Sequence, residues 1–406
     1  MEFRPILSAM RRNKVGAILI SLQMAITLAI LCNGIFIIVQ RVALSKRPTG
    51  ADESNIFVIP NQWVGSPPDL VARLRGDLTA LRGLPGVIDA YATNSTLLSN
   101  GGSSEGVNLK PDQKEASAQT ALYFADEHAL NALGLKLVSG RNFNADEVTD
   151  KMGYTDHGPA SVVIITRALA EKLFPGKTAL GQSIYVQPAD HAMQVVGVVE
   201  RMQVPWVGSW SAKFNDNSIL EPFRYADTYA YYVVRSQPNQ LAGVLKAAEK
   251  KLYEVGHDRV LEKIKSLTEA RAEVYQDDRG LAVILGVVCT ALVAVMAFGI
   301  VGLTSYWVAQ RRRQIGIRRA LGATRSAILH YFQTENCLIA ASGAALGIGL
   351  AVCLNLWMVS TFEMERLHLS YPISGAFVML LLGQASVLWP AMKAASVPPA
   401  LATRAS

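Results

Sequence analysis

One short segment of this chain has residue types that could bind a phosphate group. Residues 174–181 read FPGKTALG and contain the run Gly176-Lys177-Thr178. A Walker A loop also needs a glycine five positions before Gly176, because the backbone N–H groups of the loop surround the phosphates, and residue 171 is a glutamate. The segment also follows a predicted helix, whereas a phosphate loop joins a strand to a helix. We therefore predict a turn here.

Other recognisable catalytic arrangements are missing from the sequence. It contains no glycine-rich dinucleotide motif, no serine nucleophile elbow and no HExxH zinc motif. The six histidines are scattered without the spacing of metal ligands. The four cysteines all fall within apolar runs, so we expect them to act as small apolar residues and not to form a disulfide in the polar middle of the chain. We therefore predict a protein without a catalytic site of its own.

Three polar side chains inside apolar runs remain as candidates for a functional role. Glu335 lies near the start of one run, and an acid within a membrane is a functional candidate because it is costly to bury in hydrocarbon. Alternatively, Glu335 lies at the membrane interface and faces an arginine of the neighbouring loop. Asn33 and Gln384 lie inside two other runs, where they are expected either to form hydrogen bonds between helices or to line a transport path.

Four apolar runs must position these side chains. We predict four transmembrane helices, at residues 15–40, 279–310, 327–360 and 371–392. The basic excess, 39 Lys+Arg against 32 Asp+Glu, flanks these runs, so we attribute it to membrane topology and not to nucleic-acid binding. The first run is much longer than the apolar core of a cleaved signal peptide, so we expect it to be retained as a helix.

The charges around the first span predict the topology. Arg11, Arg12 and Lys14 precede this span and place its start in the cytoplasm, and four spans then place both termini there. Residues 1–14 have the apolar spacing of an interfacial helix, with a frayed tail as the alternative. The remaining short segments are an outer loop at residues 361–370 and a cytoplasmic tail at residues 393–406.

The segment at residues 41–278, between the first two spans, is long enough to form its own hydrophobic core. Its apolar patterns predict a large α/β (α+β) extracytoplasmic domain. We predict strands at residues 56–59, 87–93, 161–166, 194–200 and 229–235, and helices at residues 69–81, 126–133, 167–174 and 240–255. Residues 94–114 are rich in Ser, Gly and Asn, which predicts a flexible loop.

A stalk is predicted between this domain and the second span. Ser266 and Glu269 have the spacing of a capping box at a helix N-terminus. The helical pattern then continues without a proline to Gln310, which predicts one continuous helix that begins near residue 266 and crosses the membrane. A break near Gly280 is the alternative.

The most basic stretch of the chain lies between the second and third spans. Residues 307–335 carry six arginines and no acid before Glu335, which predicts a cytoplasmic loop at residues 311–326. Within this loop Ile317, Ala320 and Leu321 have the spacing of one helical face, and Gly322 is positioned to end the helix. Such a short amphipathic helix could lie on lipid or could dock into a groove of another protein.

A small-residue motif occurs in the third span. Gly343 and Gly347 form a G-x-x-x-G motif, and such residues let two helices approach closely in lipid. The motif is common in apolar helices, so it is weak evidence for dimerisation. We predict that these two glycines lie at a helix–helix contact.

The basic stretch resembles a known family. The sequence RRRQIGIRRALGATRSAILHYFQTE is similar to the signature of the FtsX-like/MacB-like permeases of ABC transporters, although Gln314 stands where that family usually has glutamate. The ending LWPAMKAASVPPALA resembles the end of the FtsX-like transmembrane domain. The segment LFPGKTALGQSI, followed by a strand ending in VVGVV, resembles the MacB-like periplasmic core domain.

The resemblance implies partners and a role for the short basic helix. It implies a dimer, formed with a second copy or with a sister permease, that binds two cytoplasmic ABC ATPase subunits on separate polypeptides. ATP and Mg would bind those ATPase subunits, and this chain would bind no cofactor. The residues that would couple the chain to the ATPase are Gln314, Ile315, Gly316, Ile317, Arg318, Ala320, Leu321, Gly322 and Ala323.

The resemblance also implies a cellular role. It implies the permease subunit of a MacB-type exporter in the bacterial inner membrane, with its large domain in the periplasm. ATP hydrolysis would drive efflux of a drug, peptide or similar substrate by mechanotransmission, and a membrane-fusion adaptor and an outer-membrane channel often complete such pumps. The alternatives are an FtsX-type protein that activates a periplasmic enzyme without transport, a lipoprotein-release permease, and a membrane-anchored sensor whose basic loop binds only lipid.

Overall fold

The computed structural model describes residues 14–65, 68–111, 113–153, 160–186, 191–362 and 364–396. The chain divides into two compact units. The helical unit comprises Met1–Ser45 and Asp277–Ser406, and the mixed unit comprises Lys46–Gln276. The predicted interfacial helix at residues 1–14 lies outside the described residues except for Lys14, as does the predicted tail beyond Ser396.

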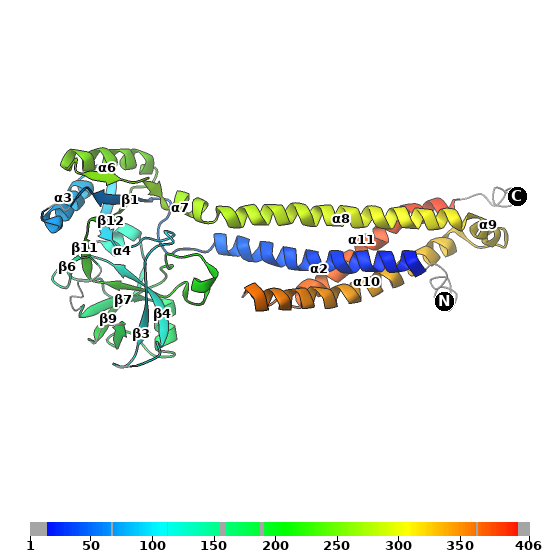
Figure 1. Ribbon diagram of the computed structural model, residues 1–406, viewed down its shortest axis with the longest axis horizontal. Coiled ribbons are helices and arrows are strands. Elements are labelled where there is room, and N and C mark those ends of the chain that lie inside the picture. Colours follow the sequence, from blue (N-terminus) through cyan, green and yellow to red (C-terminus); the bar gives the residue numbers. More distant parts are fainter. Residues whose placement is uncertain are drawn as a thin grey trace. The chain divides into compact units, whose positions relative to one another are not determined.

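The described part of the helical unit consists of four long apolar helices and one short basic helix (Figure 1). Its elements are α2 (Lys14–Ser45), α8 (Gln276–Gln310), α9 (Arg312–Ala320), α10 (Arg325–Phe362) and α11 (Ser370–Ala395). Among the described helices, α2, α8, α10 and α11 are long and apolar enough to cross a membrane. These four helices coincide with the four predicted spans, so the chain combines four membrane-length helices with a large mixed domain.

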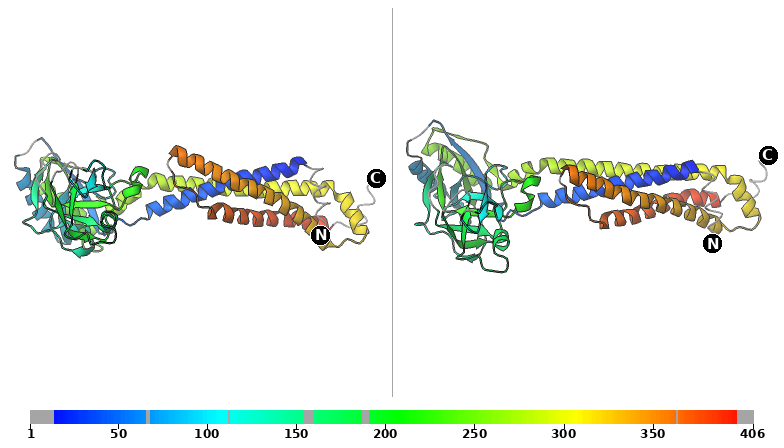
Figure 2. Two further views of the ribbon diagram at one scale, coloured as in Figure 1. Left: turned by 90° about the horizontal axis from the view of Figure 1, so that it is seen from below. Right: turned by 60° about the horizontal axis from the view of Figure 1, so that its bottom comes forward.

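The helical unit packs mainly around α2 and α10, which lie side by side in both views of Figure 2. Ile20, Met24 and Leu28 of α2 are almost fully buried, and they share one apolar cluster with Ile339 and Ala340 of α10. In contrast, few residues of α8 are buried within the single chain, and many of its large apolar side chains are exposed. An exposed apolar helix of this length is stable in lipid because its backbone hydrogen bonds are internal.

The predicted continuous stalk is interrupted. One residue, Tyr275, separates the helix α7 (Leu267–Val274) from α8, and its backbone has φ −97° and ψ 15°. The Tyr275 side chain is buried, and the helical pattern of the sequence does not reveal this break. Gly280, the alternative break, lies inside α8. The predicted capping box is present, because the Glu269 N–H donates to Ser266 Oγ and the Ser266 N–H donates to Glu269 Oε2.

The mixed unit contains an antiparallel sheet with two helices packed on it (Figure 1). The strand order is β13-β1-β12-β2, and β14 also pairs with β1. The strands are β1 (Ile56–Trp63), β2 (Val87–Thr93), β12 (Tyr229–Ser236), β13 (Arg259–Leu261) and β14 (Lys265–Ser266). The helices α3 (Leu70–Arg82) and α6 (Leu241–Val255) contribute Leu74, Leu78 and Val244 to the core of this layer.

A second sheet of seven strands forms the other layer of the mixed unit, in the order β5-β9-β7-β10-β4-β3-β8. Its strands are β3 (Ser103–Asn108), β4 (Ala118–Phe124), β5 (Leu137–Gly140), β7 (Val162–Thr166), β8 (Ser183–Val186), β9 (Met193–Val199) and β10 (Ser218–Glu221). The other elements are α4 (Ala129–Leu133), α5 (Arg167–Leu173), the 3-10 helix η1 (Ser209–Phe214) and the strand pair β6 (Thr149–Met152) and β11 (Phe223–Ala226). The mixed unit is therefore an α/β domain, as predicted.

The strongly apolar strands were predictable, and the polar ones were not. The predicted strands at residues 87–93 and 161–166 correspond to β2 and β7. The predicted flexible loop at residues 94–114 is wrong over β3, which pairs antiparallel with β4 and β8. The Ser and Gly residues of β3 have low strand propensity, and the strand forms because its backbone completes a ladder with distant strands.

A buried glutamate makes the stability of the mixed unit dependent on pH. Burial raises the pKa of Glu221 to about 7, although the nearby Lys151 charge lowers it and Glu105 raises it. The pKa of Glu221 in the folded state is above its ordinary value of 4.5. The contribution of this protonated side chain to the free energy of unfolding is therefore complete below pH 4.5 and is lost as the pH rises through about 7. We expect the thermal unfolding temperature of the purified full chain to increase when the pH is lowered from 8 to 5.

The Glu221→Gln variant should show a smaller pH dependence over the same interval, because the titrating carboxyl is absent. The pH dependence of the free energy of unfolding that this variant loses is at most about 1.4 kcal/mol per pH unit. Replacement of an exposed glutamate of α6, Glu249→Gln, is the matched control and should leave the slope unchanged. Equal slopes for the wild-type chain and Glu221→Gln would contradict this assignment.

Candidate functional site

The short basic helix α9 presents an apolar face to its surroundings. It spans Arg312–Ala320 and is followed by a turn in which Gly322 has a φ of +97°, a conformation that favours glycine. Ile317 is 47% exposed and Leu321 is 82% exposed, and Ala320 is also exposed. These three residues form the face predicted from the sequence. A leucine this exposed at the end of a helix is available to contact another surface.

The opposite side of this segment is attached to the bundle. Ile315 is buried in the same apolar cluster as Ile328 and Phe332 of α10, and Gly316 is also buried. The Arg318 guanidinium lies 5.2 Å from the ring centroid of Tyr331, which is a cation–π distance. Gln314 is exposed, and Ala323 is half-buried after the turn. The predicted coupling residues therefore divide into a buried base and an exposed apolar edge.

An ion pair anchors the start of α9. Arg311 Nη1 donates to Glu335 Oε2 over 2.9 Å, and both side chains are largely buried. Of the two interpretations of Glu335, the structure supports contact with an arginine of the loop. Because a charge buried without its partner is strongly destabilising, this pair fixes the chain between α8 and α9 against α10.

The two glycines of α10 lie against α2 of the same chain. A Cβ atom at Gly343 would be 2.8 Å from the Ser21 carbonyl oxygen, and one at Gly347 would be 3.0 Å from Leu28 Cβ. The contact is supported by polar groups, since Asn33 Nδ2 donates to the Ala351 carbonyl oxygen over 3.1 Å. The glycines therefore allow close packing within one chain, and they do not by themselves indicate a dimer.

The three polar residues predicted inside the spans do not form one site. Glu335 contacts Arg311, whereas Asn33 contacts Ala351, which is 16 residues further along α10, or about 24 Å along a helix. The Nε2 atom of Gln384 is buried and has no hydrogen-bond partner among the described residues. The first two side chains join helices, so the described part of the bundle does not bring these residues together along one path.

The sequence did not reveal two ion pairs that hold the chain segments flanking the spans. In the helical unit, Arg41 of α2 contacts Asp278 of α8 over 2.8 Å, and we name this pair the helical-unit clamp. In the mixed unit, Arg271 of α7 donates two hydrogen bonds of 2.7 Å to Glu53, and we name this pair the mixed-unit clamp. Opposite charges near the two span ends were the signal that could have suggested these contacts.

Further contacts strengthen the mixed-unit clamp. Burial opposes ionisation of Glu53, but hydrogen bonds from Arg271 and Thr49 lower its pKa overall. Thr49 Oγ1 donates to Glu53 Oε1 over 2.6 Å, and Thr268 Oγ1 donates to the Glu53 carbonyl oxygen. The segment that follows α2 is therefore bonded to the helix that precedes α8.

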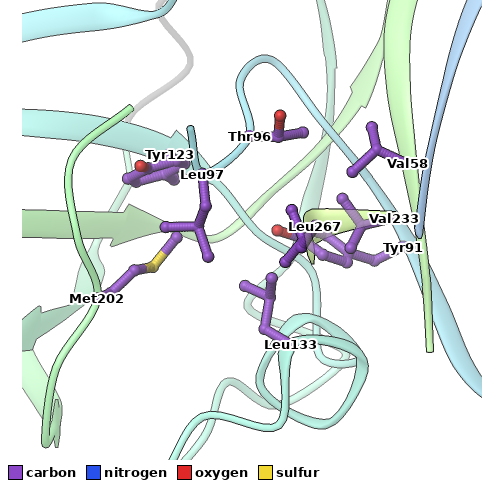
Figure 3. A pocket seen from close by; sticks show the side chains of 9 residues that line it. All are labelled: Val58, Tyr91, Thr96, Leu97, Tyr123, Leu133, Met202, Val233 and Leu267. Atoms are coloured by element: carbon purple, nitrogen blue, oxygen red, sulfur yellow. The ribbon is translucent and has the colours of Figure 1, made fainter. Parts of the chain in front are cut away.

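The first residue of α7 reaches the centre of the mixed unit. Leu267 lines a small cavity between the two sheets, together with Val58, Tyr91, Thr96, Leu97, Tyr123, Leu133, Met202 and Val233 (Figure 3). The space among these side chains is too small to admit a water molecule, so it is not a ligand site. Because Leu267 is packed there, a displacement of α7 would be transmitted to both sheets.

The segment with the phosphate-loop resemblance forms a turn, as predicted. The helix α5 ends at Leu173, and the Lys177 N–H donates to the Phe174 carbonyl oxygen over 3.0 Å. Gly176 has a φ of +72°, which this turn requires. Lys177 is exposed.

Family comparisons agree with this arrangement. Residues 19–251 match the model of the MacB-like periplasmic core domain, and residues 286–399 match that of the FtsX-like permease C-terminal domain. The chain therefore belongs to the family of ABC transporter permeases that combine these two domains. This finding confirms the resemblance seen in the sequence.

Individual relatives are distant. The macrolide export ATP-binding/permease protein MacB of Chromobacterium violaceum is 27% identical over 66% of this chain and 40% of its own length, so this chain spans less than half of that relative. The uncharacterized ABC transporter permease YknZ of Bacillus subtilis is 22% identical over 81% of this chain and 78% of its own length. The periplasmic region of MacB from Actinobacillus actinomycetemcomitans covers 57% of this chain and 97% of its own at 15% identity, with a TM-score of only 0.35.

Proposed function

We propose that this chain is the permease subunit of a MacB-type ABC exporter that works by mechanotransmission. The observation that carries the proposal is the exposed edge of Ile317, Ala320 and Leu321 on a helix whose other side is fixed to the bundle. An exposed apolar edge on an anchored helix suits docking into a groove of an ATPase subunit. ATP and Mg would bind that ATPase, which would be a separate polypeptide, and the permease would act as a dimer.

The membrane topology is part of the proposal. Both termini and α9 would lie in the cytoplasm of a bacterial cell, the four long helices would cross the inner membrane, and the mixed unit would lie in the periplasm. The arginines of residues 311–325 support this orientation because basic loops stay on the cytoplasmic side. A membrane-fusion adaptor and an outer-membrane channel would complete an efflux pump for a drug, peptide or similar substrate.

Close packing in the bundle favours force transmission over passage through the spans. Gly343 and Gly347 bring the backbones of α2 and α10 into contact, and Asn33 joins them by a hydrogen bond. A movement that ATP binding causes at α9 would then travel along α8 to α7, and from Leu267 into the mixed unit. An FtsX-type protein that activates a periplasmic enzyme could use the same contacts, and lipoprotein release is a third use of this architecture.

We expect Arg271→Gln to uncouple ATP hydrolysis from movement of the mixed unit. The variant removes the positive charge that Arg271 contributes to the mixed-unit clamp. A hydrogen bond to a charged group contributes roughly 1.5–3 kcal/mol. Its loss therefore shifts the equilibrium between a clamp with the ion pair formed and one with the ion pair broken by about tenfold or more. The complex with its ATPase would be reconstituted in nanodiscs, with spin labels at Glu254→Cys in both copies of a chain lacking other cysteines. The wild-type distance distribution should change with ATP.

In Arg271→Gln this ATP-dependent change should be lost while ATP hydrolysis continues. The matched control is Lys250→Gln, which removes an exposed helix ion pair with Glu254 and is examined by hydrolysis alone. An unaltered distance change in Arg271→Gln would refute force transmission through the mixed-unit clamp. Export of a substrate by the wild-type complex would separate an exporter from an FtsX-type activator.

A further inference from the structure

A hydrogen-bonded loop of the mixed unit exposes a tryptophan side chain at the surface of this unit. We name residues 204–215 the tryptophan loop. Its three aromatic rings pack together, with ring centroids of Trp206 and Trp210 4.9 Å apart and those of Trp210 and Phe214 5.3 Å apart. Trp206 and Phe214 are buried, whereas Trp210 is 54% exposed. The other two rings therefore support the base of the exposed one.

Hydrogen bonds fix this exposed arrangement. The Val204 N–H donates to the Asn215 carbonyl oxygen over 2.9 Å and closes the loop. Ser211, which is fully buried, donates from Oγ to the Gly208 carbonyl oxygen over 2.9 Å. The hydrogen bonds of the loop therefore hold Trp210 in an exposed position. Exposure of half of this apolar ring to water is unfavourable, and contact with another apolar phase would remove that cost.

The base of the tryptophan loop is bonded to the segment that leaves the first membrane-length helix. The Gln203 N–H donates to the Thr49 carbonyl oxygen over 2.9 Å, and Arg47 Nη2 lies 3.1 Å from Asp216 Oδ2. Thr49 is four residues beyond Ser45, the last residue of α2, so at most ~14 Å of extended chain separates them. The base of the loop is therefore bonded to a residue that follows the end of α2 by only a few positions in the chain.

The residues around the loop suit the headgroup layer of a bilayer. Tryptophan is enriched at membrane–water interfaces because its ring is apolar and its N–H is polar. Lys46 and Lys213 are exposed, and each basic side chain near an anionic surface contributes on the order of 1 kcal/mol of attraction. Asp216 offsets Arg47, so the exposed charges next to the loop are positive on balance.

We propose that the tryptophan loop inserts Trp210 into the headgroup region of the membrane that α2 crosses, on the side where the mixed unit lies. This contact would support the mixed unit next to the bilayer independently of α7 and α8. It requires only that α2 spans the membrane, and it does not depend on ATP-driven transport.

The test uses the full chain in liposomes that contain anionic phospholipid. The native cysteines are replaced by alanine, and bimane is attached at Trp210→Cys or, with Trp210 retained, at Ser209→Cys. Quenching is measured with phospholipids carrying a nitroxide near the headgroup and, separately, with aqueous iodide. Glu254→Cys, on an exposed turn of α6, is the reference position.

Both loop positions should be quenched by the lipid nitroxide at least about twofold more than the reference, and they should be protected from iodide, as expected for a group in the interface. Quenching equal to the reference by both agents would overturn the proposal. Protection that appears only when a partner protein is added would also overturn it, because the loop would then be a protein-binding surface. The Ser209→Cys measurement keeps the test valid if removal of Trp210 disturbs the loop.

Discussion

Replacement of Leu321 by aspartate is expected to abolish assembly of this permease with its ATPase while leaving it inserted in the membrane. Leu321 is 82% exposed, so the substitution disturbs no packing within the chain. At a docked interface the aspartate would be buried without a partner, which costs several kcal/mol and therefore reduces affinity by a factor of about 10³ or more. Co-purification of the ATPase with the tagged permease measures the effect.

A matched control variant distinguishes the loss of the docking surface from a general effect of the added negative charge. Ser326→Asp adds the same charge in the first turn of α10, where Ser326 is exposed and an acid at a helix N-terminus is stabilising. This control should still bind the ATPase. Gly316 is a less suitable position, because it is buried and a side chain there would disturb the base of α9. If Leu321→Asp retains the ATPase at the wild-type level, α9 is not the coupling helix, and contact with lipid becomes the better interpretation.

The second large effect is expected at the pair of Arg311 and Glu335. Glu335→Arg would place two positive charges in contact in a largely buried site, and loss of such a pair costs roughly 3–5 kcal/mol. We expect this variant to release α9 from the bundle, to lose ATPase binding and to unfold at a lower temperature in detergent. Arg311→Glu should have the same effect, because it leaves two carboxylates in contact.

The exchanged double variant, Arg311→Glu with Glu335→Arg, provides the decisive comparison. It restores opposite charges in the same place, so we expect it to recover a substantial part of both stability and ATPase binding. The measurements are thermal unfolding and co-purification for the two single variants and the double variant. If the losses of the single variants simply add in the double variant, the ion pair does not position α9.

The extent to which the sequence predicted the structure depended on the strength of each local pattern. The long apolar runs predicted α2, α8, α10 and α11, because about 20 apolar residues have few alternatives to a membrane helix. The capping box at Ser266 was predicted because its contacts are only three residues apart. In contrast, β3 was missed because its polar residues form a strand only through pairing with β4 and β8.

The same limit applied to the candidate site. The exposed face of Ile317, Ala320 and Leu321 could be predicted, because it follows from the 3.6-residue period of one helix. The bonds of Arg271 to Glu53 could not, since the two residues are far apart in the sequence. The break at Tyr275 could not either, because the helical pattern continues through it. Likewise, the motif of Gly343 and Gly347 indicated a close contact, but only the packed bundle identified α2 as the neighbouring helix.

The membrane-length helices, the position of the mixed domain between the first two, and the family could all be derived from the amino-acid sequence, because each depends on a continuous stretch of residues. Which charges meet depends instead on the packing of the folded chain. The pairs Arg41 with Asp278, Glu53 with Arg271, and Arg311 with Glu335 depend on how distant segments fold against one another. Local periodicity reports which face of an element is apolar, and it contains no information about the residue that a side chain will contact across the fold.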